Sequence, residues 1–312
     1  MVDQDRSRTT GFQGSEAMQA AEAAGEDYGK VKGRTQREIV WRRFKRHRLA
    51  IAGGLLLVLI YAAALATPVI APYEYDESDF TSLNQAPSVE HPMGTDRLGR
   101  DEFTRVLYGG RVSLMVGLGV GTFATLVGGL IGLLSGYYGR RVDTALAGVM
   151  DFVLVLPFLP MLLVLGSIFR FSAFTITFVI ALLLWPRMAR IVRGQVLSLR
   201  NQDYVQAARA IGVSDVKRAL RHILPNVVGI MVVEATLVVA QAILIETAVS
   251  YLGLGIQPPT PSWGNMLEDS RTTMTTQWWL TWFPGLMIVI TALCVNFLGD
   301  GLRDALDPKA IE

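Results

Sequence analysis

The sequence predicts an all-α integral membrane protein with about six transmembrane helices. Of its 312 residues, 51% are hydrophobic, and the charged residues are confined to stretches between long apolar segments. Two of these segments, residues 49–71 and 112–136, contain no charged side chain. Each exceeds the ~20 residues that a helix needs to cross a bilayer, so they are the first two predicted spans.

Four further apolar segments complete the predicted set: residues 145–168, 171–191, 227–249 and 282–298. The fourth span is interrupted by Pro186 and Arg187, which leaves its inner end open. The last span begins beside Trp278 and Trp279, and aromatic rings of this kind favour the membrane interface. Residues 112–303 are therefore expected to form the membrane-embedded core.

Basic residues lie mainly on one side of the predicted spans. With the N-terminus placed in the cytoplasm, the inner segments carry 21 Lys and Arg residues, and the outer segments carry 5 when the first of them is counted over residues 73–110. Cytoplasmic loops are enriched in Lys and Arg, so both termini and the loop at residues 194–226 are expected in the cytoplasm. The segments at residues 72–111 and 250–281 are then extracytoplasmic.

The two ends of the chain differ in composition from the spans. Residues 1–33 are rich in Gln, Ala, Glu, Gly and Ser, which predicts a disordered cytoplasmic tail. In residues 34–48 basic residues alternate with large apolar ones, which predicts an amphipathic segment on the membrane surface. A plain basic flank of the first span explains these charges equally well. Residues 304–312 are expected to form a second cytoplasmic tail.

The most informative segment is the polar, basic run YVQAARAIGVSDVKRALRHILPN, residues 204–226. Gly212 follows good helix formers and can adopt the positive φ that ends a helix. Ser214 is the predicted N-cap of a second helix, which Pro225 is expected to end or kink. Two faces are expected on that helix, an apolar one with Val216, Ala219, Leu220 and Ile223 and a basic one with Lys217, Arg218 and Arg221.

A solvated loop or a DNA-reading helix-turn-helix would also join basic helices through a glycine turn. The flanking membrane spans argue against DNA, so no nucleic-acid partner is expected.

This run resembles the cytoplasmic signature loop of bacterial ABC importer permeases, which reads Glu-Ala-Ala, three residues, Gly, and in the peptide branch continues to His-x-Leu-Pro-Asn. The matching residues are Gln206, Ala207, Ala208, Gly212, His222, Leu224, Pro225 and Asn226. Gln206 departs from the pattern, because it loses the charge of Glu while keeping a hydrogen-bonding side chain of similar length. The resemblance implies that the loop couples the permease to an ATPase, with Arg209, Val213, Ser214 and Arg218 as further contact residues.

Three more segments resemble one branch of this family, the DppC or OppC type of subunit in dipeptide and oligopeptide importers: residues 91–114, 246–271 and 299–309. The resemblance covers about residues 35–309. It implies a type I importer permease (MetI-like) fold in a bacterial or archaeal cytoplasmic (inner) membrane.

The implied partners are a second permease of the DppB or OppB type, one or two cytoplasmic ATP-binding subunits of the DppD or DppF type, an extracytoplasmic peptide-binding protein of the DppA type, and the lipid bilayer.

Enzymatic motifs are missing from the sequence. The Walker pattern fails at its nearest candidate, residues 25–31, and neither HExxH nor GxSxG occurs. Cys294 is the one cysteine, and the three histidines are far apart in the sequence. The chain is therefore expected to be a transport subunit that binds no cofactor or metal, with ATP and Mg bound in the partner subunits.

Charged residues within the spans are candidates for the translocation path, because an unpaired charge at depth costs at least ~2.5 kcal/mol. These candidates are Asp151, Glu234 and Glu246. Ion pairs with Arg187, Arg190 or Arg193 explain the first two equally well. Glu246 is expected near the outer end of its span, where hydration is easy, so it is a weaker candidate for the translocation path.

Acidic residues of the predicted outer segment are candidates for contacts with the binding protein or the second permease: Asp76, Asp79, Asp96 and Asp101. A solvated acidic loop explains them as well.

Glycines recur at intervals of four in the second span: Gly117 and Gly121, then Gly128, Gly132 and Gly136. Small residues at this spacing favour close helix packing over a role in lining the path.

Other functions remain open at this level. A self-sufficient secondary transporter or channel would use inverted repeats and broken helices, and no internal repeat is visible. A membrane sensor would bind a regulator through the same loop. Relatives of this branch carry dipeptides, longer peptides, nickel chelates or glutathione, and the sequence does not distinguish among these substrates.

Overall fold

The computed structural model describes residues 36–306. The predicted tail at residues 1–33 and most of the tail at residues 304–312 lie outside the described residues. Helix α2 (Gln36–Phe44), which ends with Arg42 and Arg43 in its last turn, falls largely in a unit that ends at Arg43 and is described by itself. The described residues from 44 to 306 belong to a second unit.

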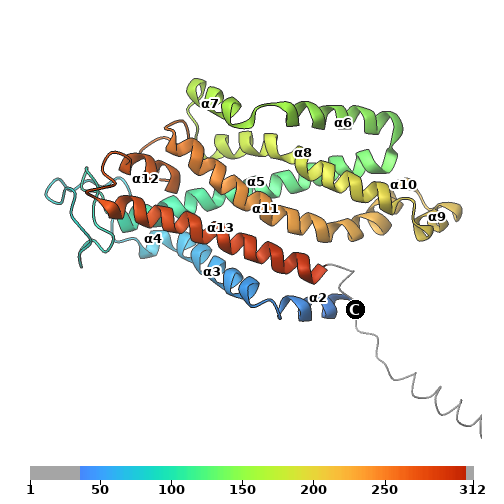
Figure 1. The fold of residues 1–312 in the computed structure, drawn as a ribbon, viewed down its shortest axis with the longest axis horizontal. Helices are drawn as coiled ribbons and strands as arrows, with labels where there is room; N and C mark the ends of the chain where they lie inside the picture. The colour runs from blue at the N-terminus through green and yellow to red at the C-terminus, as the bar shows by residue number, and fades with distance from the viewer. Residues whose placement is uncertain (1–35, 307–312) are drawn as a thin grey trace, which may run out of the picture. The chain divides into compact units, whose positions relative to one another are not determined.

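This unit is built from helices and their connections, and its described residues form no β-strand (Figure 1). The helices are α3 (Arg48–Leu65), α4 (Thr67–Ile70), α5 (Glu102–Tyr138), α6 (Arg140–Val155), α7 (Phe158–Ile168), α8 (Ala173–Leu199), α9 (Asp203–Ala210), α10 (Asp215–Arg218), the π-helix η1 (Ala219–Ile223), α11 (Leu224–Tyr251), α12 (Trp263–Ser270) and α13 (Trp278–Leu306). Helices α9 and α10 lie at one end of the bundle and α12 at the other (Figure 1).

Among the described residues, five helices are long and apolar enough to cross a membrane: α3, α5, α8, the continuous stretch Asp215–Tyr251, and α13. A sixth crossing is formed if α6 and α7, which meet at an angle of 75°, count as one broken span. The prediction of about six transmembrane helices in an all-α protein is therefore confirmed.

Several helices extend beyond the predicted spans. Helix α5 begins at Glu102, inside the segment predicted as an outer loop, and α8 runs through Pro186 to Leu199. Hydropathy locates only the part of a helix that lies in hydrocarbon, whereas backbone hydrogen bonding continues into the polar region. The first predicted span is shorter than expected. Its helix α3 ends at Leu65, close to Pro68, whose ring disfavours a continuous helix.

The periodic glycines of α5 lie in two close helix contacts. Gly128, Gly132 and Gly136 face α8, where a Cβ on Gly132 would lie 2.4 Å from the carbonyl oxygen of Ala189. Gly117 and Gly121 instead face side chains of α11, in which a Cβ on Gly117 would lie 2.7 Å from Ile243. The packing interpretation of these glycines is therefore supported, because each contact leaves no room for a side chain.

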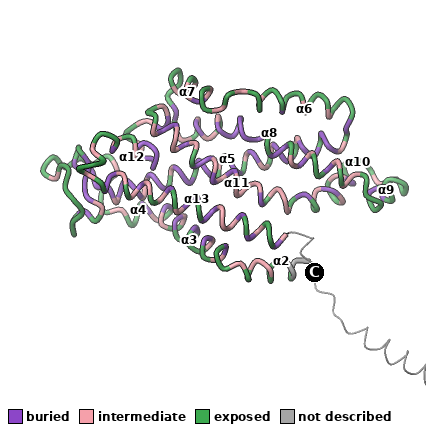
Figure 2. The backbone as a smooth tube through the Cα atoms, viewed as in Figure 1, coloured by how far each residue is buried: buried purple, intermediate pink, exposed green. Residues whose placement is uncertain are grey.

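Burial follows this arrangement. Figure 2 shows the buried residues concentrated along α5 and α8, whereas α6 is mostly exposed. Met150 is the one fully buried residue of α6. Helix α3 exposes several large apolar side chains, among them Leu55, Val58 and Leu59. Apolar surface of this extent marks contact with a membrane or a partner.

We predict that Gly132→Ala destabilises the purified chain by about 1–3 kcal/mol, because the added methyl group overpacks the α5–α8 contact. Thermal unfolding in detergent measures this effect. The matched control is Gly148→Ala on α6, where the new Cβ would have no heavy atom within 4 Å. Equal melting temperatures for the two variants would mean that the α5–α8 contact is loose.

Candidate functional site

The helical hairpin of residues 203–223 contains the predicted turn at Gly212. Gly212 has φ +81°, its N–H donates to the carbonyl of Arg209 (3.1 Å), and the N–H of Val213 donates to the carbonyl of Ala208 (3.0 Å). This pair of bonds is the Schellman arrangement that ends helices at a glycine. Ser214 directly precedes α10, as predicted for an N-cap, but its side chain makes no capping hydrogen bond.

The second helix of the hairpin is continuous with a membrane span. Helix α10 leads into the π-helical turn η1, in which the N–H of Leu224 donates to the carbonyl of Ala219, and η1 leads into α11. Pro225 therefore does not end the helix. It lies in the first turn of α11, directly after the irregular π turn, where a residue without a backbone N–H is tolerated.

The predicted apolar face of this helix is wrong. Ile223 is fully buried, but Val216 and Leu220 are 61% and 53% exposed. A π turn inserts an extra residue, which rotates the residues before it relative to those after it. Val216 and Leu220 therefore point outward, together with Ile211, which is 82% exposed, and the half-exposed Tyr204. We refer to Tyr204, Ile211, Val216 and Leu220 as the apolar crest of the hairpin.

The predicted basic face is also wrong in one residue. Lys217 and Arg221 are exposed, but Arg218 is buried and pairs with Asp215. Asp215 in turn accepts a hydrogen bond from the hydroxyl group of Tyr137 on α5 (3.0 Å). Arg218 therefore supports the carboxylate through which Tyr137 joins the hairpin to α5, and it is less exposed than Lys217 and Arg221. Its contact with an ATPase stays a prediction.

The remaining signature residues form an exposed group and a group that is buried or half-buried. Six of them are exposed: Gln206, Ala207, Arg209, Ser214, Pro225 and Asn226. Val213, His222 and Leu224 are half-buried, and Ala208 is buried. Gln206 donates to the carbonyl of Arg200 (3.0 Å), and Asn226 donates to the carbonyl of His222 (2.8 Å). These bonds stabilise the two ends of the hairpin.

Two acidic residues of α6 pair with arginines of α8. Asp151 lies 2.5 Å from Arg190, so for Asp151 the ion-pair alternative is present. Arg193 makes two hydrogen bonds to Asp143, of 2.5 and 2.7 Å, and this pair was not predicted. Its signal in the sequence is weak, because Asp143 lies outside the apolar segments.

Glu234 differs from these residues. Within residues 36–306 it makes no side-chain hydrogen bond or ion pair, and it is half-buried. Seven residues further along α11, Gln241 accepts a hydrogen bond from Arg187 (3.3 Å). Because seven residues are close to two helical turns, Glu234 and Gln241 lie on the same side of α11.

The expectation for Glu246 is wrong. Glu246 is fully buried rather than hydrated, and it accepts hydrogen bonds from Ser113 on α5 (3.0 Å) and from Ser250 (2.8 Å). The hydroxyl group of Ser113 also accepts the backbone N–H of Trp263 at the start of α12 (3.3 Å). Hydrophobicity alone does not reveal this arrangement, because it depends on Ser113, which lies far from Glu246 in the sequence, and on the chain folding back so that α12 begins beside Ser113.

Comparison with known proteins agrees with this architecture. A family described as the inner membrane component of binding-protein-dependent transport systems matches residues 128–312. A second family, the N-terminal transmembrane domain of oligopeptide transport permease C, matches residues 35–87. The chain belongs to the first of these families, the inner membrane components of binding-protein-dependent transport systems.

Individual relatives match most of the permease. The oligopeptide transport system permease protein OppC of Escherichia coli (strain K12) is 43% identical over 281 residues, which are 89% of this chain and 93% of that protein. The dipeptide transport system permease protein DppC of Bacillus subtilis (strain 168) is 40% identical over 270 residues, 86% and 84% of the two chains. A putative peptide permease protein of Brucella suis biovar 1 (strain 1330) is 43% identical over 270 residues, 86% and 89% of the two chains.

These matches confirm the resemblance seen in the sequence. The permease is an ABC permease of the OppC and DppC type with a MetI-like, all-helical fold. It is a multi-pass inner membrane protein and a transport subunit.

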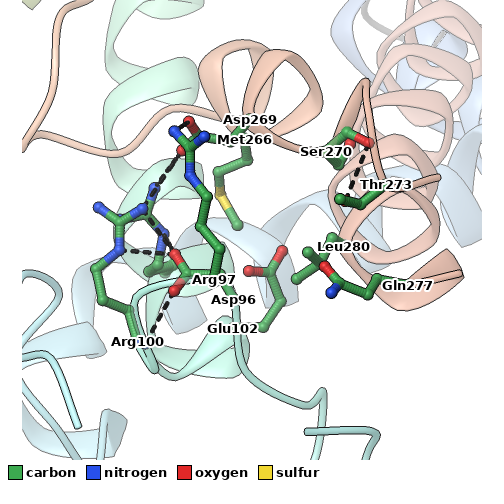
Figure 3. A pocket seen from close by; sticks show the side chains of 11 residues that line it. Asp96, Arg97, Arg100, Glu102, Met266, Asp269, Ser270, Thr273, Gln277 and Leu280 are labelled. Carbon is green, nitrogen blue, oxygen red and sulfur yellow. Dashed lines mark hydrogen bonds and ion pairs between the residues drawn. The ribbon is translucent and has the colours of Figure 1, made fainter. Parts of the chain in front are cut away.

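At its α12 end, the permease carries a cluster of charges that sequence reasoning did not assemble. Asp96 accepts hydrogen bonds from the backbone N–H (3.0 Å) and the side-chain Nε (2.7 Å) of Arg100. Asp269 on α12 lies 3.3 Å from Arg105 and 3.5 Å from both Arg100 and Arg97. Figure 3 shows Asp96, Arg100 and Asp269 facing one another. The cluster joins the segment before α5 to α12.

Beside this cluster lies a cavity of about 20 Å³. Its lining includes the buried side chains of Glu102 and Arg105, together with Gln277 and Leu280 from the region where α13 begins. Figure 3 shows Glu102 and Gln277 on the side of the pocket away from Arg100. The space suffices for a single water-sized group.

Two of the predicted partner-contact residues are not available at the surface. Asp96 and Asp101 are buried, and Asp101 both caps α5 through the N–H of Thr104 (2.8 Å) and lies 2.9 Å from Nδ1 of His91. Asp76 and Asp79 are exposed. Hydrogen bonds from Thr81 and Ser82 lower the pKa of Asp79 to about 2.

We predict that Glu246→Ala destabilises the permease by about 1–3 kcal/mol, because the hydroxyl groups of Ser113 and Ser250 lose a buried acceptor. Glu246→Gln keeps an acceptor oxygen and is expected to cost less. Thermal unfolding of the purified chain compares both with Glu268→Ala, which removes an exposed carboxylate from α12. If Glu246→Ala has the same melting temperature as the Glu268→Ala control, the hydrogen bonds to Glu246 contribute little to stability.

Proposed function

We propose that this chain is one of two permease subunits in an ATP-driven importer of di- or oligopeptides. In this proposal, an extracytoplasmic binding protein delivers the peptide, and one or two cytoplasmic ATPases drive its passage. The names of the relatives support a peptide as the substrate class. The single structural observation that carries the coupling role is the apolar crest on an otherwise polar hairpin.

The crest has the composition of a docking surface. The hairpin exposes the apolar side chains of Tyr204, Ile211, Val216 and Leu220, and it also exposes three basic residues, Arg209, Lys217 and Arg221. Apolar side chains that project into water favour burial against a partner, and a polar rim around them is usual in protein interfaces. A groove in a soluble ATPase fits this description better than lipid does, because the hairpin itself is polar.

The hairpin is also connected to the membrane helices at two points. Helix α10 continues through η1 into α11, and the bond between Tyr137 and Asp215 ties it to α5. A displacement of the crest by the ATPase would therefore act directly on α11 and α5. In this role Gln206, Ala207, Ala208, Gly212, Val213 and Ser214 shape the docking surface, and His222, Leu224, Pro225 and Asn226 form its connection to α11.

The translocation path in this proposal runs beside α8 and α11. Arg187, Gln241 and Glu234 lie on these two helices, and Glu234 has no partner among the described residues. Charges at such depth face a cavity or a partner rather than lipid. Asp151 pairs with Arg190 on α8 and so lies next to this region. Glu246 is buried beneath α12, so its role in this proposal is in helix packing.

The test is to purify the tagged chain from native membranes, identify the proteins that accompany it, and reconstitute them in liposomes. We expect a second permease, ATP-binding subunits, and ATP hydrolysis that rises with a peptide-loaded binding protein. Uptake of labelled di-, tri- and pentapeptides then compares the substrate lengths. If the chain transports solute when reconstituted alone, it is a secondary transporter instead.

We predict that Gly212→Val inserts normally but loses peptide-stimulated ATP hydrolysis. No atom lies near the position of the new Cβ, so the loss would come from φ +81°, which costs a β-branched residue roughly 1–2 kcal/mol. Gly212→Asn is the matched control, because Asn tolerates this conformation, and it is expected to retain most of the coupling. Full coupling in the Val variant would contradict the proposed role of the hairpin.

A further inference from the structure

An open apolar groove of about 470 Å³ lies at the corner between α5 and α6. It is lined by Leu134, Tyr138, Val142, Ala145 and Leu146, and the lining exposes no polar surface. The corner itself is made by Gly139 and Arg140, both with positive φ. The groove therefore runs from this sharp turn along the first turns of α6.

Basic side chains adjoin the groove. Arg140 and Arg141 are exposed at the start of α6, directly before the lining residue Val142. Arg200 reaches the same corner from the end of α8, where its Nη1 donates to the carbonyl of Gly136 (3.0 Å). Three arginines thus belong to the corner at one end of an apolar surface: Arg140 and Arg141 by their place in the chain, and Arg200 by its hydrogen bond to Gly136.

Among residues 36–306, no acidic side chain neutralises the two exposed arginines. Asp143 is the acidic residue in the first turn of α6, and its carboxylate is occupied by Arg193 and by the hydroxyl group of Ser135 (2.6 Å). Within the described part of the chain, Arg140 and Arg141 make no side-chain hydrogen bond or ion pair. The corner therefore combines a surplus of positive charge with an apolar groove.

We propose that this corner binds one anionic phospholipid, with an acyl chain in the groove and the phosphate headgroup on Arg140 and Arg141. A soluble anion would use only the arginines, and a neutral lipid would use only the groove. An anionic phospholipid uses both, and basic pockets between membrane helices are known to take such headgroups. With the orientation of the proposed function, the lipid belongs to the cytoplasmic leaflet.

The bound chain would also contact the anchor of the coupling hairpin. Tyr138 lines the groove and packs edge-on against Tyr137, with ring centroids 5.4 Å apart. Tyr137 donates the hydrogen bond to Asp215 that holds α10. An acyl chain beside Tyr138 thus lies one side chain away from the hairpin.

The experiment incubates the purified full-length chain with equimolar phosphatidylglycerol and phosphatidylcholine of identical acyl chains. Native mass spectrometry then counts the retained lipids. The wild type is expected to favour phosphatidylglycerol, and Arg140→Gln with Arg141→Gln should lower that preference about fivefold for each arginine removed, since one basic residue near anionic lipid contributes about 1 kcal/mol. Ala145→Trp fills the groove and should reduce retention of both lipids.

The matched control is Arg111→Gln with Arg170→Gln, which removes two exposed arginines outside this corner and should leave the preference unchanged. Thermal unfolding checks that every variant is folded. An unchanged preference in the Arg140 and Arg141 variant, or unchanged retention in Ala145→Trp, overturns the proposal. The proposal is also overturned if, in the assembled importer, a protein subunit covers the groove and no lipid is retained there.

Retention is measured on the single chain and does not require transport. A chain that selects phosphatidylglycerol while its reconstituted complex carries no peptide would refute the proposed function and leave the lipid site standing.

Discussion

The close contact between α5 and α8 is the constraint on which the rest of this permease depends. Gly128, Gly132 and Gly136 bring the two backbones together, so that the positions of their missing side chains are filled by carbonyl groups and side chains of α8. In a bilayer, water does not drive helices together, and close van der Waals contact takes over that role. The other glycines of α5, Gly117 and Gly121, leave space for side chains of α11 to pack against it.

The opposite arrangement operates at the α12 end, where polar groups join the helices. Glu246 links α11 to α5 through Ser113, and Ser113 links both to α12 through the backbone of Trp263. Asp269 adds contacts to three arginines from the segment before and within α5. Buried polar networks of this kind specify one arrangement of their elements, because each group that loses its partner costs free energy.

Much of the fold is accessible from the sequence, because apolar runs of bilayer length and the spacing of the glycines are local signals. The turn at Gly212 is accessible for the same reason. The orientation of the following helix is not, since it depends on the π turn at residues 219–223, which rotates Val216 and Leu220 outward. The hydrogen bond from Tyr137 to Asp215 is not accessible either, because the two residues lie far apart in the sequence.

The same limit applies at the other end of the molecule. The density of Asp and Arg in residues 96–105 is visible in the sequence, but their arrangement requires Asp269, which only the fold brings near. The position of Glu246 along its span predicts hydration, but α12 and Ser113 bury its carboxylate. The surroundings of Asp96 and Glu246 thus depend on tertiary contacts, which hydropathy and local spacing do not contain.

The unbroken path from Asp215 to Tyr251 has a mechanical consequence. These 37 residues make a rod roughly 55 Å long at the rise of an α-helix. Such a rod is stiff in compression, so its two ends move as one body unless it bends at the π turn. The π turn lies near the hairpin, which leaves most of the rod on the side of Glu246. If the stretch tilts about a pivot at the π turn, its α12 end moves further sideways than its hairpin end, because most of its length lies on the α12 side of that turn.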